Sequence, residues 1–404
     1  MNSRLHNLLH NCKNLIMYFP RMIKGKNALK AKEKILSIKR NMTRDKVKVG
    51  FIVQMPEIWD KEAPVFEALL RDDRFDVCLI VVPHYDYSKD KLCSYGDELE
   101  YFRNKYPDLQ LITLKDLKDN VIDDSYDYIF YQRCWEQYLP VQLRCRNVIK
   151  HAMTCYTPYC FHCGPESHSY YCIDFFRYLS KFYCCSKDQN EEVKQIGYID
   201  SSYLGYPGFT ALDYSKKRSG NTNILWTPRW INDQYGGSTF YKYKDKILDL
   251  LDISDSISLK LRPHPLTFEN AVKEKRMTEE EVNEYIEKIR SAGASFDRNK
   301  IVGETFSDTD ILITDFSSVV VFYYVSGRPI IYCSDTNIPM TGLFRQILDS
   351  VYIAKTWDDV YRFTKDLVNG IDPLYEKRQE VIRKMDVSKD SVSEIVEDLY
   401  KTLN

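Results

Sequence analysis

The sequence has no uninterrupted apolar stretch long enough to cross a lipid bilayer. A membrane-spanning helix needs about 20 consecutive apolar residues, whereas a run such as 319–325 is short and typical of strand or helix cores. The start of the chain also lacks the continuous apolar segment of a secretory signal, because Asn, Lys and Cys interrupt its leucines and isoleucines. The sequence therefore predicts neither a transmembrane nor a secreted protein.

Several familiar nucleotide and metal motifs are missing as well. The chain has no G-x-x-x-x-G-K, no G-x-G-x-x-G and no H-E-x-x-H, which argues against a P-loop enzyme, a dinucleotide-binding domain and a zinc protease of that type. What is present is typical of a folded protein, with 44% hydrophobic and 28% charged residues. A chain of 404 residues indicates two domains of roughly 150–200 residues each.

The 12 cysteines are scattered through strand-like and helix-like segments. Without a secretory signal, this distribution favours reduced, buried thiols and a cytoplasmic location. The spacing of Cys155, Cys160 and Cys163 leaves an alternative open, because it matches that of ferredoxin ligands, with Cys172, Cys184 or Cys185 as a fourth. A zinc site that includes His162 is a further alternative. The segment is rich in Tyr and Pro rather than Gly, so we expect no metal and no other cofactor.

Charge is distributed unevenly along the chain. The net charge is -1, but residues 1–48 carry 13 Lys and Arg against two acidic residues, so the remainder is strongly acidic. Apolar residues in this segment recur at three- and four-residue steps, which places them on one face of a helix. They are Leu5, Leu8, Leu9, Cys12, Leu15 and Ile16. We expect residues 1–46 to form a basic amphipathic arm on an anionic membrane surface. The alternative is a helix packed on the first domain with its basic face in solvent.

Strand-like and helix-like segments alternate after the arm. Apolar strands are predicted at 47–53, 76–82, 109–114 and 126–131, and again at 223–228, 256–261, 310–314 and 329–333, with a polar linker at 213–223. This alternation predicts parallel α/β layers. We expect two Rossmann-like domains, at 47–212 and 223–385, that face a central cleft, followed by an amphipathic helix within 386–404.

The segment 310–319, D-I-L-I-T-D-F-S-S-V, predicts a strand that ends at a hydroxyl-rich helix start. Backbone N–H groups and the positive end of the helix dipole at such a start favour a phosphate. The hydroxyls of Thr314, Ser317 and Ser318 add possible donors. A plain helix cap would give the same pattern.

Two further segments strengthen the phosphate interpretation. R-P-H-P at 262–265 follows a predicted strand, and its prolines prevent a helix from starting there. Arg262 offers a planar fork for phosphate, and His264 can donate a hydrogen bond or move a proton. I-L-W-T-P-R-W at 224–230 again runs from a strand into a loop, where Arg229 can contact a nucleotide. Its Trp residues are equally typical of a core.

The order of these three motifs, with R-P-I-I-Y-C-S-D at 328–335 after them, resembles the CDP-glycerol glycerophosphotransferase family of teichoic-acid polymerases and primases. G-Y-P at 205–207 and Asp213 also resemble the family's G-Y-P-R-x-D. The resemblance runs from about Cys184 to the end of the chain. It implies a GT-B fold, with the first domain on the acceptor side and the second binding the donor. The donor-binding residues that it implies are Arg229, Arg262, His264, Thr314, Asp315, Ser317, Ser318 and Asp335.

The implied activity is transfer of glycerol phosphate, or another polyol phosphate, from a CDP-linked donor to a hydroxyl of a lipid-linked or cell-surface glycan, with release of CMP. The resemblance, together with the basic arm, implies CDP-glycerol, a lipid-linked acceptor and an anionic membrane surface as partners, and no nucleic acid. The expected location is cytoplasmic, on the inner face of the cell membrane.

The first domain departs from the family pattern. The family's W-H-G-T-P carries the His thought to act as the base, whereas this chain has C-Y-T-P at 155–158. Because His best supplies a base near pH 7, we expect His162 to act as the base and His264 to assist, with His168 as a further candidate. Two alternatives stay open. One is a GT-B glycosyltransferase that uses a nucleotide sugar, and the other is a non-catalytic, membrane-associated binding subunit.

Overall fold

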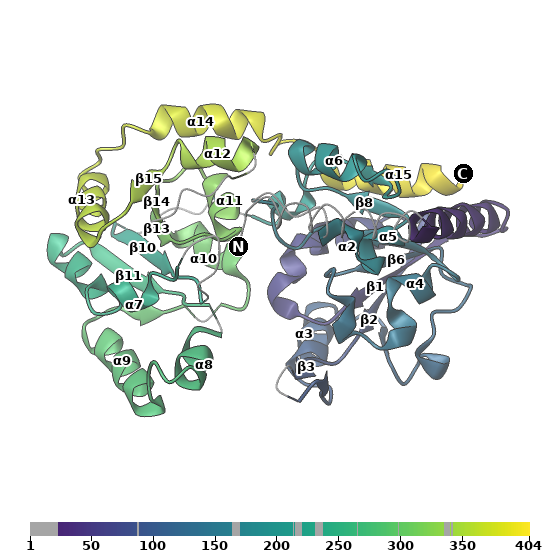
Figure 1. Ribbon diagram of the computed structural model, residues 1–404, viewed down its shortest axis with the longest axis horizontal. Helices are drawn as coiled ribbons and strands as arrows, with labels where there is room; N and C mark the ends of the chain where they lie inside the picture. Colours follow the sequence, from purple (N-terminus) through teal and green to yellow (C-terminus); the bar gives the residue numbers. More distant parts are fainter. Residues whose placement is uncertain are drawn as a thin grey trace, which may run out of the picture. The chain divides into compact units, whose positions relative to one another are not determined.

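The computed structural model describes residues 23–86, 89–163, 170–212, 214, 220–230, 237–264, 266–297, 299–334, 340 and 342–404. The described residues divide into two compact units. Those within 1–159, 166–208 and 389–404 form unit 1, and those within 160–165 and 209–388 form unit 2. Each unit is a layered α/β structure with a parallel sheet (Figure 1), as the alternating pattern predicts.

Unit 1 is built on a seven-stranded sheet with the order β5-β2-β1-β6-β7-β8-β9, in which all neighbouring strands are parallel. The central strand β1 is V-K-V-G-F-I-V, an almost continuous apolar run of the kind found where both faces of a parallel sheet are covered. The strands are β1 (Val47–Val53), β2 (Phe75–Val81), β5 (Leu111–Thr113), β6 (Tyr128–Tyr131), β7 (Met153–Tyr156), β8 (Lys181–Tyr183) and β9 (Ser201–Ser202). A small antiparallel pair, β3 (Tyr85–Asp86) and β4 (Lys91–Leu92), stands apart.

Helices connect these strands and cover both faces of the sheet. The α-helices are α2 (Ala63–Leu70), α3 (Asp97–Lys105), α4 (Cys145–Val148), α5 (Asp174–Arg177), α6 (Lys187–Lys194) and α15 (Ser391–Leu403). The 3-10 helices are η1 (Pro56–Lys61), η2 (Lys118–Asn120), η3 (Glu136–Tyr138), η4 (Val141–Leu143) and η5 (Tyr170–Cys172), and η6 (Pro207–Phe209) follows where the sequence passes to unit 2. Alternate residues of β1 point to two separate cores. Phe51 lies in the core beneath α2 and α15, and Ile52 lies in the core on the opposite face.

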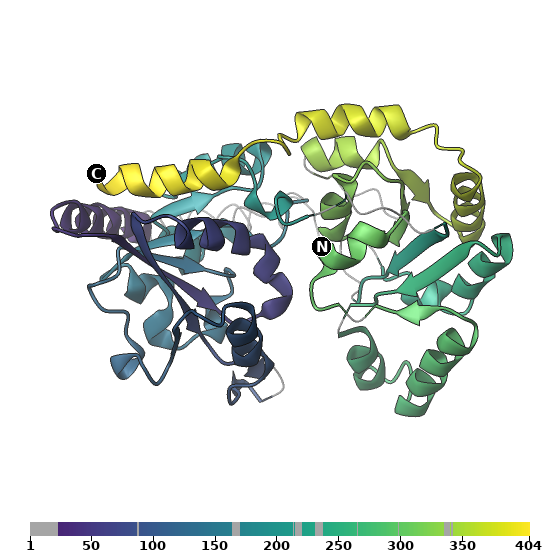
Figure 2. The ribbon, with the colours of Figure 1, turned by 180° about the vertical axis from the view of Figure 1, so that it is seen from behind.

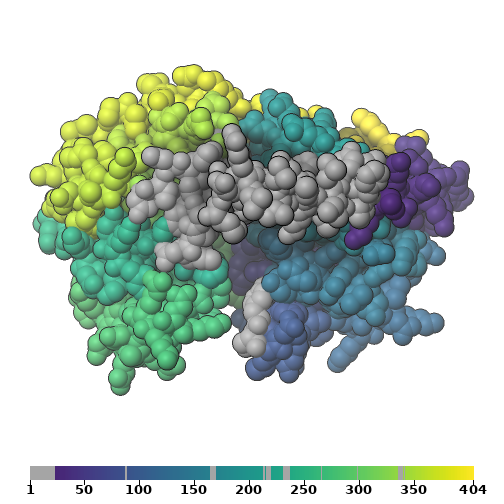
Figure 3. All heavy atoms as spheres, viewed as in Figure 1, coloured from purple at the N-terminus to yellow at the C-terminus, as the bar shows by residue number. Residues whose placement is uncertain are grey.

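The helix over residues 23–40 and the C-terminal helix α15 lie on one face of unit 1. They run next to each other in both ribbon views (Figures 1 and 2), and Arg40 donates from Nε to the carbonyl of Thr402 at 2.8 Å. Residues of both helices form part of the surface of unit 1 in the space-filling view (Figure 3). The helix predicted near the C-terminus therefore packs on the first unit and not on the unit that precedes it in sequence.

Only part of the predicted basic arm can be compared with the structure. Its apolar face, from Leu5 to Ile16, lies outside the described residues. In the helix over 23–40, two lysines face inward, and their amines donate to carbonyl oxygens of unit 1, Lys32 to Tyr198 and Lys39 to Asp124, both at 2.6 Å. Lys26, Lys30 and Lys34 are exposed and follow one another at four-residue steps, so they share the outer face.

Unit 2 is built on a six-stranded parallel sheet with the order β12-β11-β10-β13-β14-β15. The strands are β10 (Thr222–Thr227), β11 (Ile257–Leu261), β12 (Ser295–Phe296), β13 (Ile311–Thr314), β14 (Ile330–Cys333) and β15 (Tyr352–Ala354). The helices are α7 (Phe240–Tyr243), η7 (Ile247–Ile253), α8 (Leu266–Lys273), α9 (Glu279–Ser291), α10 (Val302–Asp308), α11 (Val319–Tyr324), α12 (Gly342–Leu348), α13 (Trp357–Val368) and α14 (Tyr375–Lys384). One core collects Ile224 and Trp226 of β10, Ile313 of β13 and the helices on that face.

The strand order of unit 2 reverses between β10 and β13. From β10 the chain proceeds to β11 and β12 on one side, and then returns to place β13, β14 and β15 on the other. In open α/β sheets, ligands bind outside the carboxyl ends of the strands at such a reversal. The three sequence motifs of unit 2 lie at this position.

No helix within the described parts of the chain is long and apolar enough to span a membrane. The cysteines among the same residues carry free thiols. In these residues no group of three or more His, Cys, Asp or Glu side chains is placed to hold a metal ion.

Candidate functional site

The candidate site of unit 2 is formed where three adjacent strands end. R-P-H-P follows β11, while T-P-R-W and T-D-F-S-S begin at the last residues of β10 and β13, and β10 pairs directly with both of the other strands. Because the strands are parallel, all three motifs emerge at the same edge of the sheet. The structure thus brings together Arg229, Arg262, His264 and the residues 314–318, which the sequence predicts as one site.

The last residues of β10 and β13 fasten the two strands together. Thr227 and Thr314 are register partners, and the hydroxyl of Thr227 donates to that of Thr314 at 2.8 Å. The Thr314 hydroxyl also bonds to the carbonyl of Thr227 at 3.1 Å, and the residue has no exposed surface. The sequence predicts a phosphate contact for Thr314, but the geometry shows a hydroxyl already used to hold the strand ends.

Asp315 ties the loop after β10 to the loop after β13. One carboxylate oxygen accepts from the backbone N–H of Arg229 at 2.9 Å and from that of Thr239 at 3.0 Å, and the other accepts from the Thr239 hydroxyl. The side chain is buried. Asp315 therefore sets the path of residues on both sides of the site, which is a positioning role.

The protonation of Asp315 reflects a balance of opposed effects. Complete burial raises the pKa of the carboxyl from 3.8 to about 6, while the hydrogen bonds from Thr239 and Arg229 and the positive charge of Arg229 act in the opposite direction. Burial has the larger effect on the pKa of Asp315, because none of these hydrogen bonds comes from a charged group. At pH 7 the group is ionised and holds three donors.

Ser317 and Ser318 are the half-buried hydroxyl residues at the start of α11. Ser317 Oγ accepts a long bond of 3.3 Å from the N–H of Val319. Ser318 occupies the N-cap position, but its side chain makes no capping bond. A plain helix cap therefore does not account for Ser318. Because α11 has only six residues, its dipole contributes little to binding an anion. The hydroxyls and the local N–H groups are the main hydrogen-bond donors available to such a ligand.

His264 stacks on Trp230, with ring centroids 5.4 Å apart and an angle of 29° between the planes. Its Nδ1 accepts from the N–H of Leu266 at 3.2 Å, so the neutral ring carries its proton on Nε2. Neighbouring protein atoms displace water from the ring and lower the pKa of His264 to about 4, although the residue as a whole keeps exposed surface. The direction of this shift makes His264 a neutral hydrogen-bond donor at pH 7.

Arg262 is held by the loop after β12. Its guanidinium forms an ion pair with Asp297, whose side chain is almost completely buried, and donates to the carbonyls of Asn299 at 2.6 Å and Lys300 at 3.1 Å. These contacts brace the loop beside the R-P-H-P segment. The guanidinium thus already has protein partners. The predicted contact of Arg262 with a phosphate stays a prediction.

The side chain of Arg229 lies over Phe316, with its guanidinium carbon 5.6 Å from the ring centre. Its backbone is fixed through Asp315. The two residues come from the loops after β10 and β13, so they again connect the central strands of the site.

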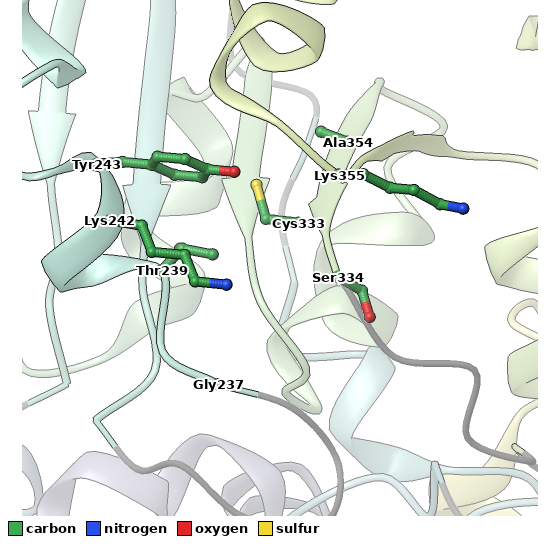
Figure 4. A pocket seen from close by; sticks show the side chains of 8 residues that line it. All are labelled: Gly237, Thr239, Lys242, Tyr243, Cys333, Ser334, Ala354 and Lys355. Atoms are coloured by element: carbon green, nitrogen blue, oxygen red, sulfur yellow. The ribbon is translucent and has the colours of Figure 1, made fainter.

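A small pocket opens beside this network, at the ends of β14 and β15 (Figure 4). It is shallow and open to solvent, has room for little more than a water molecule, and is lined by Gly237, Thr239, Lys242, Tyr243, Cys333, Ser334, Ala354 and Lys355. Figure 4 shows the Tyr243 hydroxyl and the Cys333 sulfur turned toward each other, with the Lys242 amine nearby. Thr239 belongs both to the pocket and to the Asp315 network. The sequence reasoning missed this pocket, although G-G-S-T at 236–239 was a usable signal for a helix start.

The remaining predicted site residues lie away from this network or outside the residues that the structure describes. Asp335, Asp213 and His168 fall outside the described residues. His162 is buried, with 7% of its surface exposed, in the short segment 160–165 that clusters with unit 2. Cys155, in the place of the family's His, is buried in β7, and burial raises the pKa of its thiol far above the ordinary value. A thiol in this state is a poor base.

Comparison with known families supports the resemblance seen in the motifs. Residues 214–397 match the family described as CDP-Glycerol:Poly(glycerophosphate) glycerophosphotransferase. The matched segment is less than half of the chain and contains the three motifs of unit 2. The resemblance to that family and the expected class of enzyme, a glycerophosphotransferase, are confirmed. No curated protein sequence matches the chain.

Solved structures resemble the chain over most of its length. The wall teichoic acid polymerase TagF, in a variant soaked with CDPG, is 14% identical with a TM-score of 0.56, and the match covers 96% of this chain and 98% of that one. A putative UDP-N-acetylglucosamine 2-epimerase from Listeria monocytogenes is 11% identical with a TM-score of 0.56, covering 87% and 95%. The epimerase from Neisseria meningitidis bound to UDP-GlcNAc is also 11% identical with a TM-score of 0.56, covering 88% and 100%. At such identities the likeness shows the fold, and the predicted GT-B class is confirmed.

Proposed function

We propose that this protein transfers glycerol phosphate, or a related polyol phosphate, from a CDP-linked donor to a hydroxyl of a lipid-linked or cell-surface glycan and releases CMP. The observation that carries the proposal is the convergence of three motifs at the strand reversal of unit 2, within the segment that matches the family. A CDPG-soaked polymerase of the same fold supports the choice of donor.

In the proposed reaction, the donor diphosphate lies against the start of α11. The hydroxyls of Ser317 and Ser318 and the Nε2–H of His264 donate to its oxygens. The acceptor oxygen forms a bond to the β-phosphorus, the bond from that phosphorus to the bridging oxygen breaks, and CMP leaves with the electron pair. Neutral donors fixed before the reaction stabilise the charge that develops. The acceptor proton goes to a base, for which His162 remains our candidate.

We place the nucleoside part of the same donor at the shallow pocket between α7 and the ends of β14 and β15, which has to widen to admit a base and ribose. It adjoins the diphosphate position through Thr239, and the Lys242 amine adds positive charge. We expect Lys242→Ala to weaken binding of CDP measured by titration calorimetry, with Lys246→Ala on the following segment as control. Equal affinities of the two variants would exclude this placement.

Replacing Ser318 tests the diphosphate position. A hydrogen bond to a charged oxygen contributes about 1.5–3 kcal/mol, so Ser318→Ala should reduce CMP release from CDP-glycerol at least tenfold. The exposed Ser291→Ala, at the end of α9, is the control. Mass spectrometry of released CMP, with a soluble synthetic glycan as acceptor, measures the effect. Unchanged release in Ser318→Ala would remove the residue from the site.

We also propose that the protein acts at the inner face of the cell membrane, where its acceptor resides. Lys26, Lys30 and Lys34 support this placement, since they are exposed along one side of the N-terminal helix. Each Lys near an anionic surface contributes about 1 kcal/mol. Replacing all three by Gln should reduce cosedimentation with phosphatidylglycerol vesicles, whereas Lys365→Gln on α13 should not. Binding that is equally strong to phosphatidylcholine vesicles would contradict the electrostatic account.

A further inference from the structure

Three side chains form a row across the carboxyl ends of adjacent strands of unit 2. Thr227 is the register partner of Thr314, and Thr314 is the register partner of Tyr332 on β14. The chain neighbours Ile313 and Ile331 point into the core on one face of the sheet. Because successive side chains of a strand point to opposite faces, Thr314 and Tyr332 share the other face. Tyr332 therefore lies beside the residue at which the T-D-F-S-S motif begins.

The hydroxyls of this row differ in their hydrogen bonding. Those of Thr227 and Thr314 bond to each other at 2.8 Å. The Tyr332 hydroxyl is buried and has no hydrogen-bond partner in the part of the chain that the structure describes. A buried Tyr hydroxyl usually has a partner, and leaving it without one costs free energy. A ligand that supplies an acceptor would remove this cost.

The Tyr332 hydroxyl lies among residues of the candidate donor site. Burial raises its pKa well above 10, and the thiols of Cys163 and Cys333 and the carboxylate of Asp315 act in the same direction. The positive charge of Arg229 acts in the opposite direction. At pH 7 the hydroxyl is therefore protonated and offers one O–H donor near a cationic group. This combination suits a phosphate oxygen, which is both a hydrogen-bond acceptor and an anion.

We propose that the Tyr332 hydroxyl donates a hydrogen bond to a phosphate oxygen of the bound donor. The inference rests on the proposed function and adds a residue of β14 to the donor site. In this role Tyr332 moves no proton. It supplies a neutral hydrogen-bond donor that its strand holds in position, in addition to Ser317 and Ser318. Because only 2% of Tyr332 is exposed, the side chains that cover it must move apart when the donor binds.

Tyr332→Phe tests this contact through two measurements on the full chain. The variant keeps the ring and removes only the hydroxyl, so in urea unfolding without nucleotide it should be at least as stable as the wild type. Its affinity for CDP, measured by titration calorimetry, should fall about tenfold, because a charged oxygen loses a hydrogen-bond donor. Unchanged affinity for CDP would overturn the proposal. A clear loss of stability without nucleotide would also overturn it, since the hydroxyl would then have a partner within the fold.

Two matched variants separate the contact from the general effects of removing a buried hydroxyl. Tyr285 on α9 also carries a buried hydroxyl without a hydrogen-bond partner within the described ranges, so Tyr285→Phe should leave the affinity for CDP unchanged. The Tyr324 hydroxyl is bonded to that of Ser350, so Tyr324→Phe should lower the stability and leave the affinity for CDP unchanged. A tenfold loss of CDP affinity in Tyr285→Phe as well would refute the assignment to Tyr332.

Smaller ligands identify the part of the donor that the hydroxyl contacts. A lower affinity of Tyr332→Phe for CDP alone identifies the β-phosphate, and a lower affinity for both CDP and CMP identifies the α-phosphate. An equal loss of affinity for cytidine would place the hydroxyl against the nucleoside and would contradict the proposal.

The result is separable from that of the proposed function. If Tyr332→Phe weakens CDP binding but the wild type releases no CMP from CDP-glycerol, the contact stands and the transfer reaction is refuted. If the wild type prefers UDP to CDP, the proposed donor is wrong, and the same comparison with UDP still tests the hydroxyl. CMP release with the same KM and kcat in wild type and Tyr332→Phe would keep the reaction and refute the contact.

Discussion

At the scale of single residues, Asp315 was predicted to contact the ligand, but its side chain holds the loops around the site in place. Its motif position suggests contact with a phosphate, yet its carboxylate accepts from the backbone of Arg229 and Thr239 and from the Thr239 hydroxyl. The loops that carry Arg229 and the pocket depend on these bonds. An acidic side chain in a phosphate site would repel the ligand. Here the three hydrogen-bond donors stabilise the negative charge within the protein.

Asp315→Asn should remove a pH-dependent part of the stability. The folded-state pKa of about 6 lies above the ordinary 3.8, so the proton stabilises the fold below pH 4 and this stabilisation is lost as pH rises to 6. At about 1.4 kcal/mol per pKa unit, the loss is about 3 kcal/mol. Urea unfolding between pH 4.5 and 7 should give a difference between wild type and variant that changes in this window. A difference independent of pH would contradict the account.

Glu62 offers a stability prediction away from the site. It is 1% exposed at the start of α2, and neither carboxylate oxygen has a hydrogen-bond partner among the described residues. Burial raises the pKa of this carboxyl well above 4.5, so stability falls as pH rises above 4.5. Glu62→Met should therefore stabilise the protein at pH 8 by about 1–4 kcal/mol, measured by urea unfolding. The exposed Glu57→Met on η1 should not, and a destabilised Glu62→Met would show that the carboxylate has an unseen stabilising partner.

Residue roles were the least predictable part of the site. The motifs predicted that Ser317, Ser318 and His264 follow strand ends, which the structure confirms, while their contact with a donor stays a prediction. The contacts that occupy Thr314 and Arg262 could not be predicted from the sequence. They depend on Thr227 and Asp297, which are distant in sequence.

At the scale of elements, α15 links the end of the chain to its first unit. Leu399 is completely buried in the core beneath β1, and its carbonyl accepts from the Tyr128 hydroxyl at 2.9 Å. Asp398 accepts from Lys181 and Tyr183, each at 2.7 Å. The amphipathic pattern predicts this helix, but the surface that it covers is set by packing that no local pattern records.

Leu399→Ala should destabilise unit 1 through the cavity that it leaves. Truncation of a buried Leu costs about 2–5 kcal/mol, so the urea midpoint should fall clearly. Lys401→Ala, with an exposed side chain on the same helix, controls for changes in helix propensity. If the two variants unfold alike, α15 does not contribute to the core as the structure indicates.

At the scale of the whole molecule, two parallel α/β units were predictable because apolar runs and helical segments alternate throughout. The strand β1 begins and ends where its apolar run does, at Val47 and Val53. The order of strands within each sheet was not predictable from these runs, and this order turns separate motifs into a site.

The central claim, that the donor is a CDP-polyol, is tested most directly by its binding. Calorimetric titration of the full chain with CDP-glycerol and with UDP-GlcNAc compares the proposed donor with that of a nucleotide-sugar enzyme. The account predicts an affinity for CDP-glycerol at least tenfold higher, which Ser318→Ala reduces and Ser291→Ala does not. Tighter binding of UDP-GlcNAc that is unaffected by Ser318→Ala would contradict it.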